Sequence, residues 1–246
     1  MLALAQTNHW LIEDLFSFPV QRLLEARKTT GAPAPDALQV RLLAPDDKDR
    51  RSAQDLIARR YEEQFGVRIV PDYPQFLTLQ NRSGDIQSAV GIRRAADAPL
   101  FLEQYLDQPV EEALAIAGLG RHPRSAIVEL GSLASLSNRA SLYLIAAMAA
   151  YMQQKGFAVA TVTGTRRLRR IFSLFDLDLS TLAAARAERL TGPARDWGSY
   201  YDDDPQVLAA PVAHCFEAAV LKATALNVSK RSGVLDSIVA QVKELA

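Results

Sequence analysis

The residue best suited to take part in a reaction is Glu129, a carboxylate inside an otherwise apolar segment. Side chains alternate between the two faces of a strand, so a strand here places Glu129 on the same face as Ile127 and Gly131. A carboxylate in apolar surroundings is costly unless it is paired or used. Two interpretations stay open: Glu129 is a general base, or it belongs to a structural ion pair with Arg121 or Arg124.

Two further clusters of side chains could bind a ligand. Arg166, Arg167, Arg169 and Arg170 begin a predicted helix, and guanidinium groups bind phosphates and carboxylates. A solvated basic face is the alternative. The segment 197–204, Trp-Gly-Ser-Tyr-Tyr-Asp-Asp-Asp, combines aromatic and acidic side chains. It is suited to a cationic amine, or it is an ordered loop whose tyrosines pack and whose acids face water.

The elements that position these residues are clearest in the middle of the chain. The pattern predicts a strand over Ser125–Leu133, a polar turn over Ser135–Asn138 and an almost wholly apolar helix over Arg139–Lys155. A second apolar strand follows over Phe157–Thr163. This order indicates a parallel pair of strands with a crossover helix buried against the sheet.

The N-terminal half adds strands and one long helix. A strand is expected over Leu38–Leu43, followed by a helix that Asp46 caps and that runs to about Phe65. Segments Gln75–Gln80 and Ile86–Ile92 predict a hairpin. A short helix is expected to start at Pro109.

The sequence predicts one central domain with an extension at each end of the chain. Residues 1–35 form a predicted N-terminal extension that closes with a proline-rich linker, residues 36–213 a single α/β domain, and residues 214–246 a helical tail packed on that domain. The tail is expected to break near 227–232.

Composition excludes several classes of function. Lysine and arginine number 28, as do aspartate and glutamate, so no global basic field favours nucleic acid. The three histidines lie far apart, so no metal site is predicted. The lone cysteine, Cys215, fits a reducing compartment. The longest apolar run, residues 142–152, is too short to span a bilayer.

The N-terminus lacks the basic start of a signal peptide, and Glu13 and Asp14 interrupt its apolar run. The sequence therefore predicts a cytoplasmic protein without a transmembrane segment. It leaves the oligomeric state open.

Several stretches, in order over about residues 80–215, resemble the thermostable hemolysin family. They are Leu100-Phe-Leu-Glu-Gln-Tyr-Leu-Asp107, Pro109-Val-Glu111, Ile127-Val-Glu-Leu-Gly-Ser-Leu-Ala134, Leu168-Arg-Arg-Ile-Phe172 and Trp197-Gly-Ser-Tyr-Tyr-Asp202. That family in turn resembles acyl-homoserine-lactone synthases and N-acyl amino acid synthases. Those enzymes use the GNAT-like fold to move an acyl chain from acyl carrier protein or coenzyme A to an amine.

The resemblance implies a GNAT-like mixed, twisted sheet flanked by helices. It implies an acyltransferase with a long-chain acyl-CoA or acyl carrier protein thioester as co-substrate, a small-molecule amine acceptor and no tightly bound cofactor. Glu129 resembles the catalytic or substrate-orienting glutamate of such enzymes, because an ammonium must lose a proton before it attacks a thioester.

GNAT enzymes carry an Arg/Gln-x-x-Gly-x-Gly/Ala loop whose backbone N–H groups meet pyrophosphate at a helix N-terminus. The matching segment here runs from Ser135 to Ala140, with Asn138 in place of the middle glycine. Asn tolerates left-handed backbone conformations, so we expect the turn to survive this replacement. A simple helix cap at Ser137 or Asn138 is the alternative.

The resemblance thus assigns two sets of binding residues. The expected donor contacts are Leu133, Ser135, Ser137, Asn138, Arg139, Ala140, Arg166, Arg167, Arg169 and Arg170. The expected acceptor contacts are Glu103, Tyr105, Trp197, Tyr200, Tyr201 and Asp202. Two other classes stay open: a membrane-active haemolytic protein, and a catalytically inactive binding module on the same fold.

Overall fold

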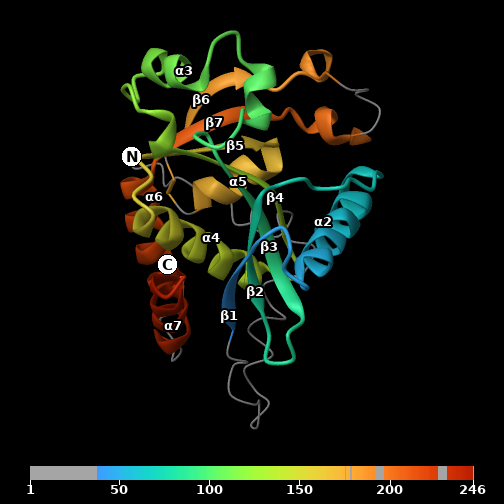
Figure 1. Ribbon diagram of the computed structural model, residues 1–246, viewed down its shortest axis with the longest axis vertical. Helices are drawn as coiled ribbons and strands as arrows, with labels where there is room; N and C mark the ends of the chain where they lie inside the picture. The colour runs from blue at the N-terminus through green and yellow to red at the C-terminus, as the bar shows by residue number, and fades with distance from the viewer. Residues whose placement is uncertain (1–37, 175, 178, 192–196, 227–231, 246) are drawn as a thin grey trace, which may run out of the picture. The chain divides into compact units, whose positions relative to one another are not determined.

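A computed structural model describes residues 38–174, 176–177, 179–191, 197–226 and 232–245. This part of the chain forms a seven-stranded sheet with helices on both faces (Figure 1). The strand order is β1-β2-β3-β4-β5-β7-β6.

The strands are β1 Gln39–Leu43, β2 Gln75–Gln80, β3 Ile86–Arg94, β4 Ile127–Ser135, β5 Val159–Gly164, β6 Ser180–Ala184 and β7 Gln206–Pro211. The α-helices are α2 Arg50–Phe65, α3 Val110–Ile116, α4 Asn138–Gln154, α5 Arg166–Leu174, α6 Val212–Leu226 and α7 Ser232–Lys243. Short 3-10 helices are η2 Phe101–Tyr105, η3 Arg124–Ala126, η4 Ala187–Arg189 and η6 Tyr200–Asp203.

The central strand-helix-strand unit has the predicted form. β4 and β5 pair in parallel, and α4 connects them. Every residue of α4 from Tyr143 to Met152 is buried, as the apolar pattern indicates. β2 and β3 form the expected antiparallel hairpin. The predicted α/β fold, a mixed sheet flanked by helices, is therefore confirmed.

Several boundaries differ from the sequence prediction, most clearly those of β4 and α2. β4 extends through Ser135, which therefore belongs to the strand and not to the turn, while Arg124–Ala126 is a 3-10 helix. Helix α2 begins at Arg50 with Asp49 at its N-cap, later than a cap at Asp46 implies. Local capping patterns locate helix ends only to within a few residues.

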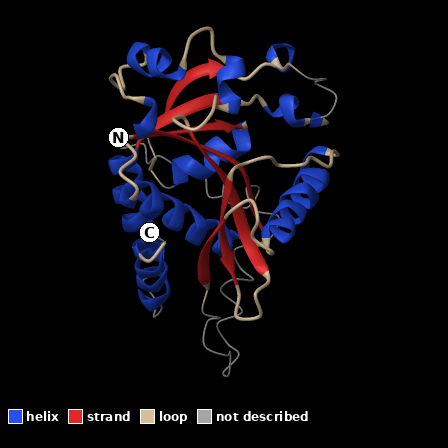
Figure 2. Ribbon diagram, in the orientation of Figure 1, coloured by secondary structure: helices blue, strands red, loops and turns tan. Residues whose placement is uncertain are grey.

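Two strands lie where the sequence predicts no regular structure. β7 inserts antiparallel between β5 and β6, which completes one edge of the sheet. β6 is the short segment Ser-Thr-Leu-Ala-Ala and β7 is a short apolar run, so neither has a distinctive local pattern. Both form because distant segments pair. Strands β1–β4 and β5–β7 run in visibly different directions (Figure 2).

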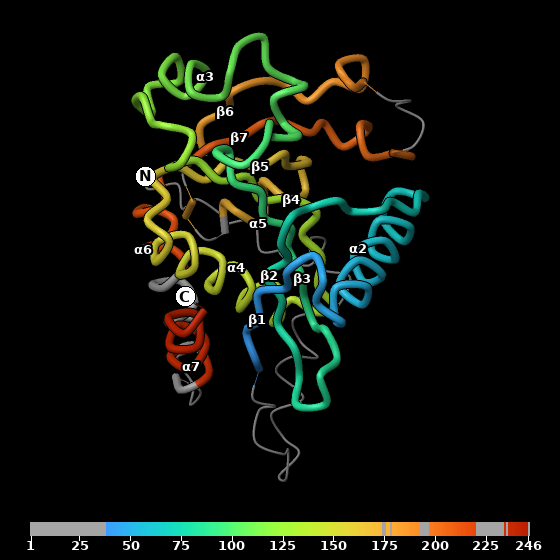
Figure 3. Tube along the Cα trace, in the orientation of Figure 1, coloured from blue at the N-terminus to red at the C-terminus, as the bar shows by residue number. Residues whose placement is uncertain are grey.

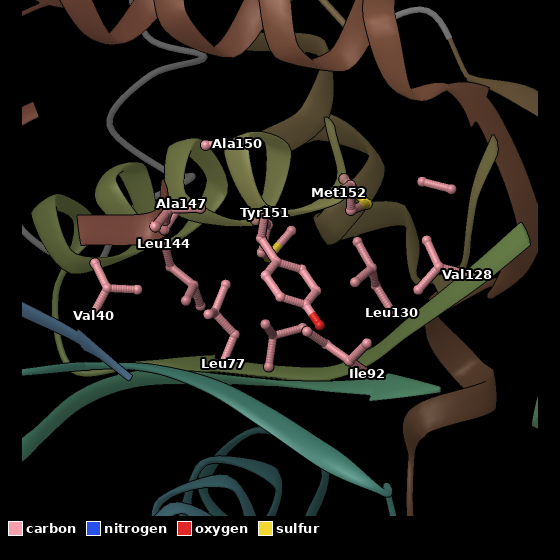
Figure 4. Close-up of a cluster of buried hydrophobic side chains, with 14 of the residues drawn as sticks. Val40, Leu77, Ile92, Val128, Leu130, Leu144, Ala147, Ala150, Tyr151 and Met152 are labelled. Carbon is pink, nitrogen blue, oxygen red and sulfur yellow. The ribbon is translucent and has the colours of Figure 1, made fainter. Parts of the chain in front are cut away.

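The two faces of the sheet have different cores. On one face, Leu144 and other residues of α4 pack on aliphatic side chains of the strands, such as Leu77, Val128 and Leu130 (Figure 4). On the other, α2 packs on β3 and β4. Residues of η2 and α3 pack there on the strand ends around Ile127. β4 therefore contributes alternate residues to two separate cores.

The C-terminal helices α6 and α7 both pack on α4 (Figure 3). Helix α7 also protects the edge strand: the Gln241 side chain accepts a hydrogen bond from the Val40 N–H (3.0 Å) and donates one to the Leu38 carbonyl (3.0 Å). The extension predicted for residues 1–35 lies outside the described residues. In the described ranges, none of the helices has the length and apolarity needed to cross a membrane.

Candidate active site

Glu129 lies at the centre of the α2 face, and only 1% of it is exposed. Its carboxylate accepts hydrogen bonds from two consecutive backbone N–H groups of η2. Phe101 donates to Oε2 at 2.8 Å, and Leu102 donates to Oε1 at 3.0 Å. The backbone of η2 therefore fixes the orientation of the carboxylate. Of the side-chain substitutions in η2, only one to proline would remove a donating N–H group.

The partner charge is Arg93, whose Nη1 lies 3.7 Å from Oε2 of Glu129. The ion-pair interpretation named Arg121 or Arg124 as the partner, and the structure places Arg93 there instead. Arg93 and Glu129 are cross-strand neighbours on β3 and β4, so the pair follows from strand register. The Arg93 guanidinium also stacks over the Tyr73 ring, 5.1 Å from its centroid.

Burial dominates the electrostatics of this carboxyl group. It raises the pKa of Glu129 to about 7, although the Phe101 N–H, the Arg93 guanidinium and the Leu102 N–H all lower it. This shift brings the pKa of Glu129 close to neutral pH. The carboxyl group can therefore both accept and return a proton under physiological conditions.

Tyr73 covers the strand face next to Glu129. Gly91 and Gly131 are direct cross-strand partners, and the Tyr73 side chain lies over both. A Cβ atom on Gly131 would lie 1.8 Å from the Tyr73 hydroxyl oxygen, and one on Gly91 would lie 2.3 Å from the ring. The two glycines therefore make the slot that holds this hydroxyl against β4.

The β4 backbone is strained beside this slot. Ser132 has a φ of +52° inside the strand, a conformation that non-glycine residues rarely adopt. Its hydroxyl is a hydrogen-bonding partner of Tyr61 and Tyr73, which lowers the pKa of both tyrosines; burial is the larger effect and raises the pKa of Tyr61 to about 12. Such strain persists only where the surroundings hold it, and it gathers at functional sites.

β4 and β5 stop pairing at the same point. Their last paired residues are Leu130 and Val162, although β4 continues to Ser135 and β5 to Gly164. The two parallel strands thus separate one residue beyond Glu129. An opening between parallel strands at their carboxyl ends is a common position for a ligand in α/β folds.

An aromatic group adjoins this point from two separate segments. Phe101 and Tyr105 come from η2, and Trp197, Tyr200 and Tyr201 from the region of η6. Ring centroids of Phe101 and Trp197 are 5.7 Å apart, and the hydroxyls of Tyr105 and Tyr201 are 2.7 Å apart. The structure therefore brings together four of the six predicted acceptor residues.

The other two predicted acceptor residues, Glu103 and Asp202, lie apart from this group. Glu103 is committed to structure: it binds Arg124 at 2.8 Å and accepts hydrogen bonds from the N–H groups of Leu100 and Val110. These bonds lower its pKa against the opposing effect of burial. Asp202 is exposed. We therefore omit both from the acceptor site.

The predicted donor turn sits at the start of α4. Ser137 is the N-cap, and its side chain accepts from the Ala140 N–H at 3.2 Å. The side chains of Ser137, Asn138 and Arg139 are exposed, while Ala140 is buried. In this turn Ser137 caps the helix, and the exposed side chains leave the helix N-terminus accessible.

Two further predicted donor residues precede this turn on β4. Leu133 packs against the α4 core, and Ser135 is buried opposite Ser88 of β3. Neither serine hydroxyl has a hydrogen-bond partner among the described residues. Both lie on the α4 side of the sheet, away from Glu129.

In the arginine cluster on α5, one side chain forms an ion pair within the protein and three are exposed. Arg169 is paired with Asp204 at 2.7 Å and also donates to the Asp204 carbonyl. The Asp203 carboxylate accepts from the Arg167 N–H at 3.3 Å, so the chain's own acids occupy this helix start. The exposed arginine side chains of α5 are Arg166, Arg167 and Arg170.

Sequence reasoning overlooked Arg93, Tyr73 and Ser132. The glycine spacing within two strands was the available signal, because glycine in a strand often marks close approach of another group. Across the residues that the structure describes, no group of three or more His, Cys, Asp or Glu side chains is placed to hold a metal ion.

Comparisons with known proteins fit this geometry. A model of the family described as thermostable hemolysin matches residues 43–216. The sequence matches no curated protein. Among solved structures, the acyl-homoserine lactone synthase LasI aligns with a TM-score of 0.51 and 16% identity, over 72% of this chain and 91% of LasI.

Two other solved structures are similar. FeeM, an N-acyl amino acid synthase from uncultured soil microbes, aligns with a TM-score of 0.52 and 14% identity, over 76% of this chain and 96% of FeeM. BjaI, a CoA-dependent acyl-homoserine lactone synthase with SAM and isopentyl-CoA, aligns with a TM-score of 0.51 and 10% identity, over 84% of this chain and 99% of BjaI. The expected GNAT-like fold is thus confirmed.

Proposed function

The chain belongs to the thermostable hemolysin family, and we propose that it is an acyltransferase that moves an acyl group from an acyl-CoA or acyl carrier protein thioester to an amine. The observation that carries this proposal is the buried Glu129 carboxyl group, which two backbone N–H groups orient; burial raises its pKa to about 7. The fold similarity to acyl-homoserine lactone and N-acyl amino acid synthases supports the reaction class.

The reaction needs a base for a definite reason. An amine is protonated near neutral pH, and an ammonium nitrogen has no lone pair with which to attack a carbonyl carbon. Glu129 takes that proton. The N–H groups of Phe101 and Leu102 stabilise its ionised form before transfer, and burial favours its protonated form afterwards.

The donor is assigned to the opening between β4 and β5. Its thioester lies beyond the last pair, Leu130 and Val162, within reach of the Glu129 face. The exposed start of α4 at Ser137 and Asn138 receives the anionic part of the donor through its backbone N–H groups.

The basic side chains Arg166, Arg167 and Arg170 lie at the start of α5, which follows β5 as α4 follows β4. Carboxyl ends of parallel strands lie at the same edge, so both helix starts face the donor's side of the sheet. Exposed guanidinium groups there suit coenzyme A phosphates or the acidic surface of a carrier protein.

The acceptor is assigned to the aromatic group of Phe101, Tyr105, Trp197, Tyr200 and Tyr201. Aromatic faces attract cations, so this group suits an ammonium-bearing small molecule on its way to Glu129. We place the protein in the cytoplasm, the compartment that supplies acyl thioesters.

The test uses purified protein with acyl-CoA or acyl carrier protein thioesters and a pool of small-molecule amines extracted from cells. Release of free thiol and the mass of any new amide are followed together. We expect thiol release that depends on the amine pool, with a matching amide. Thiol release without an amide, or none with any donor, contradicts the proposal.

A further inference from the structure

Thr163 on β5 carries a buried hydroxyl with no use in the fold. Its Oγ1 atom is shielded from solvent and has no hydrogen-bond partner among the described residues. A buried hydroxyl without a partner is unfavourable, so native proteins rarely retain one without a reason. A ligand with a hydrogen-bond acceptor would supply the missing partner of this hydroxyl.

Thr161, two residues earlier on the same strand, gives a direct contrast. Its Oγ1 donates to the Val128 carbonyl at 3.0 Å. The two threonines point to the same face of β5, since they are two residues apart. Thr161 lies where β4 and β5 are still paired, and Thr163 lies just beyond their last pair. The hydroxyl of Thr163 loses a partner where the strands separate.

The position of Thr163 relates it to the candidate active site. Thr161 is the cross-strand partner of Glu129. Thr163 therefore lies on the same face as Glu129, two residues further along β5 toward the opening. The Tyr200 hydroxyl donates to the Thr163 carbonyl at 3.5 Å, which joins this residue to the aromatic group. On the β4 side of the opening lie Gly131 and the strained Ser132.

The other orphaned side chains have different settings. Ser88 and Ser135 are cross-strand partners on the α4 side of the sheet. Gln80 lies at the end of β2 beside the edge strand β1. Of these groups, Thr163 is the one on the Glu129 face at the opening.

We propose that the Thr163 hydroxyl donates a hydrogen bond to the carbonyl oxygen of the acyl thioester, so that it positions the donor and stabilises the oxyanion of the transition state. This assignment rests on the proposed acyl transfer. A thioester that enters between β4 and β5 brings an acceptor oxygen to the place where Thr163 lacks one.

The ammonium gives a proton to Glu129, and the free amine nitrogen forms a bond to the thioester carbon. The carbonyl π electrons move to the oxygen, where Thr163 donates its hydrogen bond. Collapse of this intermediate re-forms the C=O bond and breaks the C–S bond. The departing thiolate takes up the proton that the nitrogen then loses, and Glu129 releases its own proton to solvent.

The test compares Thr163→Val with Thr161→Val, a matched control on the same strand and face. Thr163→Val removes a hydroxyl that has no partner, so the melting temperature stays the same or rises. Thr161→Val removes the hydrogen bond from the Thr161 hydroxyl to the Val128 carbonyl, so the melting temperature falls by roughly 2–4 °C. Thr163→Ser keeps the hydroxyl and should retain most activity.

The ligand experiment uses octanoyl- and palmitoyl-CoA, their carrier protein counterparts, and thioether analogues that lack the carbonyl oxygen. Wild-type protein should bind the thioester more tightly than the thioether, and Thr163→Val should lose that preference. Its kcat should fall by about 10²–10³-fold, as for loss of one oxyanion donor.

Each outcome is decisive. A Thr163→Val variant that melts like Thr161→Val, or that keeps both the thioester preference and kcat, overturns the assignment and leaves the proposed function standing. Wild-type protein that binds none of these donors and transfers no acyl group overturns both.

Discussion

The two faces of β4 use neighbouring residues in opposite ways. Val128 and Leu130 point toward α4, where Leu144 and other aliphatic side chains pack without a charge. Glu129 lies on the α2 face, where its buried carboxylate adjoins the Tyr73 side chain and the partly exposed Arg93 guanidinium. One strand thus contributes an ordinary core on one face and an electrostatically unfavourable cluster on the other.

This difference separates stability from chemistry. Apolar burial accounts for the packing of α4 on the strands, because each buried aliphatic side chain stabilises the fold. The α2 face keeps a charge that burial opposes, a strained Ser132 and a slot made by two glycines. Proteins retain such features where function requires them.

The largest expected effect comes from Glu129→Gln. Gln keeps the shape of the side chain but accepts no proton, so acyl transfer should fall by about 10²–10⁴-fold when chemistry limits the rate. Transfer rate and melting temperature are measured on one preparation. A folded variant with wild-type turnover would show that the carboxylate is a bystander.

Leu144→Ala is the counterpart on the α4 face. Leu144 is fully buried, so its truncation should lower the free energy of unfolding by about 2–5 kcal/mol. Turnover per folded molecule should stay at the wild-type value, since the site lies across the sheet. Denaturant titration and a transfer assay below the melting temperature measure the two quantities. A large loss of turnover would mean that the two faces are not independent.

The pH dependence of stability also distinguishes the faces. The pKa of Glu129 is raised from 4.5 to about 7 in the folded state, so its protonated form favours folding. This contribution is fully present below pH ~4.5 and is lost as pH rises through about 7. Relative to Glu129→Gln, wild-type protein should lose up to about 3 kcal/mol between pH ~4 and ~8.

Unfolding curves of the two proteins, recorded across this pH range in the same buffer series, measure that difference. The Leu144→Ala variant serves as the control, because it keeps Glu129 and should follow the wild-type pH dependence. A constant gap between wild type and Glu129→Gln would mean that the carboxyl group titrates normally.

The smallest effect is expected at α5. Replacing Arg166, Arg167 and Arg170 by Glu should weaken donor binding by roughly tenfold, and wild-type affinity should fall as salt rises. Arg169 is left intact because it binds Asp204, so its loss would disturb the fold. Reversal of three other exposed arginines, Arg59, Arg82 and Arg121, is the matched control. Equal affinity in both triple and control variants removes α5 from the donor site.

The sequence predicts the local parts of this arrangement. Apolar periodicity identifies α4 and its flanking strands, and the same alternation singles out Glu129. What it misses depends on long-range pairing. Arg93 becomes the partner of Glu129 through the β3–β4 register, and Tyr73 reaches the site from a loop. β6 and β7 lack a local pattern strong enough to predict them.

The central claim is that the Glu129 face carries out acyl transfer. The most direct measurement is mass spectrometry of lipid extracts from cells that express wild-type protein, Glu129→Gln or neither. We predict a new acylated amine with wild-type protein and its loss with Glu129→Gln. Identical extracts from all three, together with dye release from vesicles by lipid-free purified protein, would contradict the account and favour direct membrane lysis.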